Sequence, residues 1–287
     1  MFAVLGITGH TGAAAAETLL AAGHKVRAVV RDKAKAAAWG ARGVELVEAD
    51  AGNAEALAAA FAGVHGAYAL IPPNPALADP IGSAIATAAA LRSAALTAKL
   101  PRLVFLSSES AHLDRGNGPV KSLHMAEAIL AEAAPKVTFL RAAYFLENWQ
   151  SGFGMAKTQG ILPSFLSHLD AKRSMVATKD IGRVAAELLL DASAPGLVEL
   201  SGKEPTSTRD VAAAFSAALG KPITPVQPPR EQWVGILTSV GLGQPYAELL
   251  AELNDGINSG HVQFSGRGVP MRGKLGIADV VKEWLAA

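Results

Sequence analysis

The sequence predicts an α/β fold: a doubly wound parallel sheet with a smaller α/β lobe toward the C-terminus. Two observations lead to this prediction. Apolar runs of strand length alternate with longer Ala- and Leu-rich runs that have helical spacing. The strand-length runs are continuously apolar, as in "FAVLG" and "LVFLSS", which is typical of strands that helices cover on both faces. Right-handed crossovers between such strands place the helices on alternate faces of the sheet.

The first half of the chain supplies six strands and five helices in alternation. Each helix begins or ends beside Gly, Pro, Asn or Asp, the residues that interrupt regular structure. The predicted strands are residues 2–6, 25–31, 44–50, 66–71, 102–107 and 137–142. The predicted helices lie at about 11–22, 33–40, 53–62, 79–98 and 119–134.

The regular alternation weakens after Tyr144. Residues 145–176 mix aromatic, Gly and polar side chains, and a helix at about 179–192 and a strand at 196–200 then resume the pattern. The segment "SGRGVPMRG" is interpreted as a turn because of its Gly and Pro content. The remaining predicted helices lie at about 207–219, 230–240, 245–257 and 277–286.

These elements divide the chain into two parts. We expect a dinucleotide-binding domain in residues 1–144, with 176–202 returning to its sheet. Residues 145–175 and 203–287 then form a smaller substrate-binding lobe. Ligands of such folds bind at the carboxyl edge of the sheet, so we expect this lobe to cover that edge.

The composition excludes several classes of function. The 26 basic and 25 acidic side chains are interspersed, so no broad charged surface for nucleic acid or an anionic membrane is expected. The absence of cysteine excludes disulfides and thiolate sites, and no helix carries two His at zinc spacing, so we expect no metal. No basic segment precedes the apolar start and no run of about 18 apolar residues follows, so we expect a cytoplasmic protein without a membrane span. Composition leaves the oligomeric state open, a homodimer included.

The stretch "GITGHTG", residues 6–12, follows the first predicted strand and opens the first helix. Gly6 permits a tight turn, Gly9 lets the backbone approach a pyrophosphate, and Gly12 lets the helix pack against the strand. Further donors for a phosphate stand between the glycines at Thr8, His10 and Thr11. A glycine-rich turn that binds nothing is the alternative. The Gly-x-x-Gly-x-x-Gly spacing is similar to that of the short-chain dehydrogenase/reductase group.

Arg31 ends the second strand, where an NAD site carries Asp or Glu about twenty residues past the glycines. A guanidinium at that place can pair with the 2′-phosphate of NADP, so NADPH is preferred over NADH as the cofactor. Asp32 is adjacent and keeps NAD open, and a solvated cluster of charges is the alternative without a ligand.

Two further strand ends are candidate parts of the cofactor site. Asp50 could accept a hydrogen bond from the adenine amino group, or it could belong to the turn before the helix that Asn53 caps. The segment "LIPPN" is a stiff edge after the fourth strand. Its residues Leu70, Ile71 and Pro72 are expected at the cofactor, and Pro73 at the substrate pocket.

Several stretches together resemble one family, the NmrA-like branch of atypical short-chain dehydrogenases/reductases. They are "GITGHTG", "AVVRD", "VEADAGN", "LVFLSSESA", the "H..AEAIL" run, "TFLRAAYFLENW", "VATKDIGRVAAELLLD" and "LVELSGKEPTSTRDVAAAFSAALGKPI". The chain looks most similar to the NADPH:quinone reductase members. The resemblance implies an NAD(P)-binding Rossmann domain with a small substrate lobe. The family includes both reductases and regulators that sense the cofactor.

Candidate residues near the nicotinamide follow the fifth strand. Ser107 and Ser108 end that strand, where their hydroxyls would face the cofactor and the substrate, respectively, or would only form a turn. Lys121 is expected on the next helix as a candidate catalytic residue, and by resemblance it holds the ribose hydroxyls of the nicotinamide. His124 shares its helix face and could donate to substrate or be structural. Glu127 is interpreted as a charge on the helix face rather than a base.

An aromatic segment after the sixth strand is the other expected wall of the pocket. Tyr144 and Phe145 are placed at the cofactor, and Tyr144 is also a candidate catalytic residue. Asn148 and Trp149 are placed in the substrate pocket. Flat apolar rings with a few donors suit a planar substrate stacked on the nicotinamide. An aromatic cluster that joins the two lobes is the alternative.

One departure from the wider dehydrogenase pattern indicates the reaction. Those enzymes use Tyr-x-x-x-Lys for proton transfer, but no tyrosine of this chain has Lys four residues later, and Asn117 stands four residues before Lys121. Quinone reduction is less demanding because its product is a stabilised phenolate-like species. We therefore expect an NADPH-dependent oxidoreductase that acts on a quinone or similar conjugated carbonyl. A non-catalytic NADP(H)-sensing regulator is the rival, and a nucleotide-sugar isomerase or dehydratase is a weaker alternative.

Overall fold

An eight-stranded sheet forms the centre of the computed structural model, which describes residues 1–286. Its strand order is β12-β10-β6-β5-β4-β1-β2-β3, and every pair in it is parallel. The predicted fold class is therefore confirmed. The strands are β1 (Phe2–Leu5), β2 (Val26–Val30), β3 (Glu45–Glu48), β4 (Ala67–Ala69), β5 (Arg102–Ser108), β6 (Lys136–Ala142), β10 (Leu197–Ser201) and β12 (Val269–Arg272).

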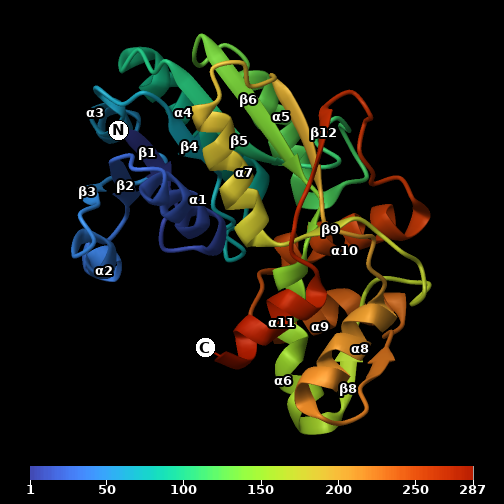
Figure 1. The fold of residues 1–287 in the computed structure, drawn as a ribbon. Coiled ribbons are helices and arrows are strands. Elements are labelled where there is room, and N and C mark those ends of the chain that lie inside the picture. The colour runs from blue at the N-terminus through green and yellow to red at the C-terminus, as the bar shows by residue number, and fades with distance from the viewer. Residues whose placement is uncertain (287) are drawn as a thin grey trace.

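Helices cover both faces of this sheet (Figure 1). One face packs on α1 (His10–Ala21) and α7 (Thr178–Leu190), and the short α2 (Ala37–Gly40) lies beside β3. The other face packs on α3 (Ala54–Phe61), α4 (Pro80–Thr97) and α5 (Lys121–Leu130). Each face has its own apolar core, as the continuous apolar strands predict.

A smaller lobe lies at the carboxyl end of the sheet (Figure 1). Its separate core is built around Leu146, Trp149 and Phe215. The remaining helices are α6 (Gln150–Gln159), α8 (Thr208–Leu219), α9 (Trp233–Ser239), α10 (Gln244–Ser259) and α11 (Ile277–Ala286). Two short parallel pairs are β7 (Tyr144–Phe145) with β9 (Met175–Val176), and β8 (Ile161–Pro163) with β11 (Thr224–Val226). The exact residues assigned to each part stay a prediction.

The strand order reverses at β1, which pairs with β2 on one side and with β4 on the other. Crossovers on the two sides of such a point run to opposite faces, so a crevice opens at the carboxyl ends of these strands. The loop from β1 to α1 lies at this crevice. Among residues 1–286, no helix is both long and apolar enough to cross a membrane.

The short strands β7, β8, β9 and β11 were not predicted from the sequence, and two longer segments also differ from the expectation. The segment interpreted as a turn, "SGRGVPMRG", contains the edge strand β12. Three of the four residues of β12 are exposed, so the run of apolar residues that signals a buried strand is missing. Pro270 is tolerated because an edge strand need not donate a backbone hydrogen bond on its outer side. The helix α6 also escaped prediction, because Gly152 and Gly154 interrupt its helical pattern.

Candidate functional site

The loop between β1 and α1 is shaped by its glycines. Gly6 has φ +72°, a left-handed conformation that residues with a Cβ rarely adopt. Its carbonyl accepts the Gly9 N–H at 2.9 Å and closes a tight turn. Gly9 is the N-cap of α1 and makes no side-chain cap, so the first N–H groups of the helix keep their capacity to donate. This end of α1 is therefore suited to an anion.

Gly12 is required by packing. A Cβ at this position would lie 2.2 Å from the Gly6 carbonyl oxygen and 2.8 Å from that of Leu5. We expect Gly12→Ala to lower the free energy of unfolding by about 1–3 kcal/mol, because α1 would have to move away from β1. Urea denaturation of both proteins measures this. The matched control is Gly154→Ala, whose added Cβ meets nothing within 4 Å; equal unfolding midpoints for the wild type and Gly12→Ala would contradict this packing role.

Thr11 lies in the first turn of α1 and is 7% exposed. The Tyr68 hydroxyl donates to Thr11 Oγ1 at 3.0 Å. Burial raises the pKa of Tyr68, so the phenol stays neutral and keeps its proton to donate. Because Thr11 Oγ1 already accepts a bond, its own hydrogen is left to donate outward. Thr11 lines two cavities, one on each side of the α1 N-terminus.

The first of these, the β2 cavity, has a volume of about 280 Å³ and lies between the glycine loop and the ends of β2 and β3. Arg31 lines this cavity and is exposed to solvent, so a ligand in the cavity can contact it. The carboxylate of Asp32 accepts the Ala34 backbone N–H at 2.8 Å and so opens the next helical turn. Arg31 is therefore the charged side chain at this cavity, and Asp32 has a local role.

The position of Asp50 differs from the one expected for a hydrogen bond to adenine. Its Oδ1 accepts the Gly52 N–H at 2.8 Å, while Asn53 caps α3 by accepting the Ala56 N–H at 3.0 Å. The neighbours of Asp50, Ala49 and Ala51, line the β2 cavity, and Asp50 is not among its lining residues. The geometry favours the turn over the ligand contact.

The second cavity, the β5 cavity, has a volume of about 450 Å³ and lies between the N-termini of α1 and α7 and the end of β5. Ser107, Ser108, Phe145 and Asn148 line it. The predicted residues that the structure gathers around the two cavities are Gly6, Thr8, Gly9, His10, Thr11, Arg31, Leu70, Ile71, Pro72, Pro73, Ser107, Ser108, Phe145 and Asn148.

A buried ion pair contacts Ser107, one of the residues that line the β5 cavity. Arg141 donates to Glu127 with two nitrogens, at 2.9 and 2.6 Å, and the two side chains are only 9% and 11% exposed. The Ser107 hydroxyl donates to the same carboxylate at 2.6 Å. Glu127 is thus a charge on the face of α5, as interpreted from the sequence, but that face is buried and Arg141 pairs with the charge. Because the Ser107 hydrogen is held by Glu127, Ser107 Oγ offers an acceptor to the cavity.

Besides Gly12 and Asp50, four other predicted residues do not line these cavities. Lys121 is exposed at the start of α5, and His124 Nδ1 is bonded to the Ala111 carbonyl at 2.9 Å. Trp149 is buried in the core of the lobe, with its indole N–H on Met175 Sδ at 3.4 Å. Tyr144 lines a different cavity and packs at an angle to Trp149. The proposed roles of Lys121 and His124 stay predictions.

Asn117 occupies the place where the absent tyrosine was expected. It is fully buried, and its amide donates to the carbonyls of Ser110 at 3.1 Å and Leu113 at 3.0 Å. These bonds fold the loop after β5 against the start of α5. Asn117 therefore has a structural role, because its hydrogen bonds hold this loop in place.

Glu147 was missed by the sequence reasoning, yet it lines the β5 cavity. Both of its carboxylate oxygens accept the Thr178 N–H at 3.0 Å, and one also accepts the Thr178 hydroxyl at 2.6 Å. Glu147 thus caps α7 from another element. Burial raises its pKa, and the bonds to Thr178 offset part of that rise. Only the pairing of distant segments reveals this role, so no local pattern signals it.

A third cavity, the lobe cavity, has a volume of about 490 Å³ and lies between the ends of β5 and β6 and the smaller lobe. Glu109 and Tyr144 line it. Burial raises the pKa of Tyr144 to about 12, with the Asn148 side chain opposing the rise. A phenol with that pKa stays protonated near neutral pH, so Tyr144 can donate a hydrogen bond but cannot act as a base.

The strand order, the reversal at β1 and the glycine loop on α1 define a protein of the Rossmann class, whose glycine loops bind dinucleotides. A family model described as the NmrA-like family matches residues 1–263. The chain belongs to the NmrA-like family, and the resemblance seen in the sequence is confirmed.

Two curated proteins are similar over most of the chain. NAD(P)H azoreductase of Xenophilus azovorans is 28% identical over 257 residues, which cover 88% of this chain and 86% of that protein. Quinone oxidoreductase 2 of Escherichia coli K12 is 27% identical over 265 residues, covering 91% of this chain and 89% of that protein. Among solved structures, the NADPH complex of the NADPH-dependent quinone oxidoreductase of Escherichia coli has a TM-score of 0.82. It has 24% identity and covers 99% of this chain and 100% of that one, which shows the shared fold.

Proposed function

We propose that this chain is an NADPH-dependent oxidoreductase that transfers hydride to a quinone or a similar conjugated carbonyl compound. The observation that carries the proposal is the pair of cavities that meet at Thr11, with Arg31 lining one and Phe145 lining the other. A dinucleotide has this shape: two rings joined by a pyrophosphate. Relatives named as quinone and azo compound reductases support the reaction class.

The residues of the β2 cavity fit the adenosine half of NADPH. Arg31 would pair with the 2′-phosphate, and the uncapped N-terminus of α1 would hold the pyrophosphate. The Thr11 hydroxyl, fixed from behind by Tyr68, would donate to the same phosphates. Each of these groups is in place in the folded chain, so little reorganisation is needed on binding.

The β5 cavity would receive the nicotinamide, which when bound supplies the hydride. Phe145 offers a flat apolar wall, while Asn148 and Ser107 offer polar atoms that can fix the orientation of a ring. The ion pair of Glu127 and Arg141 holds Ser107 in place from below. The chain thus contributes orientation and exclusion of water, and the cofactor contributes the reactivity.

Steady-state oxidation of NADPH with a panel of benzoquinones, naphthoquinones and azo dyes tests this proposal. We expect turnover with quinones, and a lower kcat/KM when NADH replaces NADPH. Tight binding of NADPH without turnover of any acceptor would overturn the proposal.

Such a result would favour the second candidate function, an NADP(H)-sensing regulator. The observation in its favour is Asn117, a structural amide at the place of the missing catalytic tyrosine. A regulator requires a protein partner whose affinity differs between the cofactor-bound and free states. Affinity capture with and without NADPH distinguishes the two functions. The nucleotide-sugar isomerase or dehydratase alternative is disfavoured by the same residue, because that chemistry needs the proton relay.

A further inference from the structure

The residue that follows Ser108 at the end of β5 is a carboxylic acid, Glu109, and the reaction proposed above gives it no role. Glu109 lines the lobe cavity together with Tyr144. Its backbone N–H is fixed on the Ala142 carbonyl at 3.0 Å, so the residue continues the sheet edge beyond β5. Among the ion pairs of residues 1–286, none involves Glu109. Glu109 is half-buried, and acids with so little contact with solvent are normally paired.

The cations that line the lobe cavity are engaged elsewhere. Arg173 donates to the carbonyls of Ala171 and Ser167, at 3.3 and 2.9 Å. Lys172 pairs with Asp210, an acid on α8. Neither charge therefore holds Glu109 in its ionised form.

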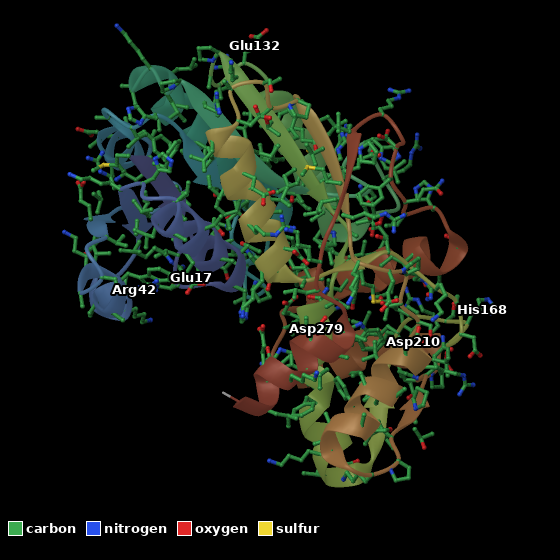
Figure 2. All side chains as sticks on the ribbon, viewed as in Figure 1. Glu17, Arg42, Glu132, His168, Asp210 and Asp279 are labelled. Carbon is green, nitrogen blue, oxygen red and sulfur yellow. The ribbon has the colours of Figure 1, made fainter. Side chains whose placement is uncertain are left out.

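Three other titratable groups lie near Glu109, and the charges of Arg141, Glu199 and Arg267 act on one of them, His112. His168 lines the same cavity, on the loop beside the smaller lobe (Figure 2). His112 lies close to Glu109, and burial, followed by the charge of Arg141, lowers the pKa of this imidazole, which favours its neutral form. Tyr144 is neutral as well. Burial raises the pKa of Glu109 to about 8, and the Tyr144 N–H offsets only part of that rise. At neutral pH the carboxyl therefore carries its proton.

The lobe cavity and the β5 cavity are neighbours at the carboxyl edge of the sheet. Ser108 lines one and Glu109, the next residue, lines the other. Two consecutive residues after β6 also line one cavity each: Tyr144 lines the lobe cavity and Phe145 lines the β5 cavity. A substrate stacked on a nicotinamide in the β5 cavity would thus have Glu109 and Tyr144 at its side.

We propose that Glu109 is the catalytic acid of this chain and that its proton goes to the oxygen of the reduced substrate. The inference rests on the function proposed above. The hydride that NADPH would supply, with the electron pair of its broken C4–H bond, would bond to one carbonyl oxygen of the quinone and leave the negative charge on the other oxygen, which the proton of Glu109 reaches. The carboxyl O–H bond of Glu109 breaks as the new O–H bond forms, and water in the cavity then returns a proton to the carboxylate. One hydride and one proton convert quinone to hydroquinone and NADPH to NADP⁺.

The test is the pH dependence of kcat/KM with a quinone for the wild type, Glu109→Gln and Glu109→Asp. Because the acid must be protonated, we expect wild-type kcat/KM to be constant below about pH 8 and to fall above it. Glu109→Gln should lose about 100- to 10,000-fold in kcat and show no fall in this range. Glu109→Asp should keep the fall. The solvent deuterium isotope effect on kcat should be present in the wild type and reduced in Glu109→Gln.

Two controls separate this role from a structural one. Glu132→Gln changes an exposed acid at the end of the sheet away from the lobe (Figure 2) and should leave rate and profile unchanged. NADPH affinity, measured by fluorescence titration, should be the same in Glu109→Gln and the wild type. Wild-type turnover with an unchanged rate and pH profile in Glu109→Gln would overturn the role of Glu109 alone. Absence of wild-type turnover would overturn the proposed function, and the role of Glu109 with it.

Discussion

Replacement of Arg141 by methionine is expected to lower the free energy of unfolding by about 3–5 kcal/mol, the usual cost of leaving one partner of a buried ion pair without its counter-charge. Arg141 donates twice to Glu127, and both side chains are about nine-tenths buried. In Arg141→Met the Glu127 carboxylate keeps only the Ser107 hydroxyl among these partners. Urea denaturation followed by circular dichroism measures the loss.

The paired variant Glu127→Leu/Arg141→Met is the control for this prediction. It removes both charges together, so we expect it to recover most of the lost stability. An exposed pair, Arg42 with Glu17, offers the comparison at the surface, and Arg42→Met should cost less than about 1 kcal/mol. Figure 2 shows this pair beside α1 and α2. A loss in Arg141→Met no greater than that in Arg42→Met would refute the account of this network.

Arg31→Ala is expected to raise the Kd for NADPH by about 10- to 100-fold and to change the Kd for NADH little. Arg31 is the charged residue that lines the β2 cavity, and only NADPH carries the 2′-phosphate that it would meet. Isothermal titration of both cofactors to both proteins gives the four constants.

Arg42→Ala is the matched control for cofactor selectivity. This arginine lies on the same side of the molecule but over the Trp39 ring, 4.4 Å from its centroid, and does not line the cavity. It should leave both affinities unchanged. An equal loss of NADPH and NADH binding in Arg31→Ala would mean that Arg31 does not read the 2′-phosphate.

The fold and the cofactor end of the site could be predicted because their signals are local. The glycine loop, the strand before it and Arg31 stand within the first 31 residues, and their spacing alone places them at one sheet edge. β12 escaped because an exposed edge strand with a proline lacks the apolar run of a buried one. Local sequence patterns therefore predict strands that are buried on both faces of the sheet. They miss a strand that is exposed at the sheet edge.

The substrate end depends on contacts between distant segments. Glu127 meets Arg141 only through the packing of α5 against the sheet, and Glu147 meets Thr178 across 31 positions of the chain. Trp149 was placed in the pocket by its aromatic character, but the 3₁₀ turn at Leu146–Trp149 directs it into the core of the lobe. Glu109 gave no signal in the sequence, because what distinguishes it is that no ion pair among residues 1–286 involves it.

The most direct test of the central claim is an anaerobic single-turnover experiment with enzyme-bound NADPH deuterated at the transferred position of C4. We expect the NADPH absorbance to decay when a quinone is mixed in, with one hydroquinone formed per NADPH. The decay should be slower for the deuterated cofactor than for ordinary NADPH. Stable NADPH in the presence of quinone, despite saturation of the site, would contradict the claim that this chain is a hydride-transferring reductase.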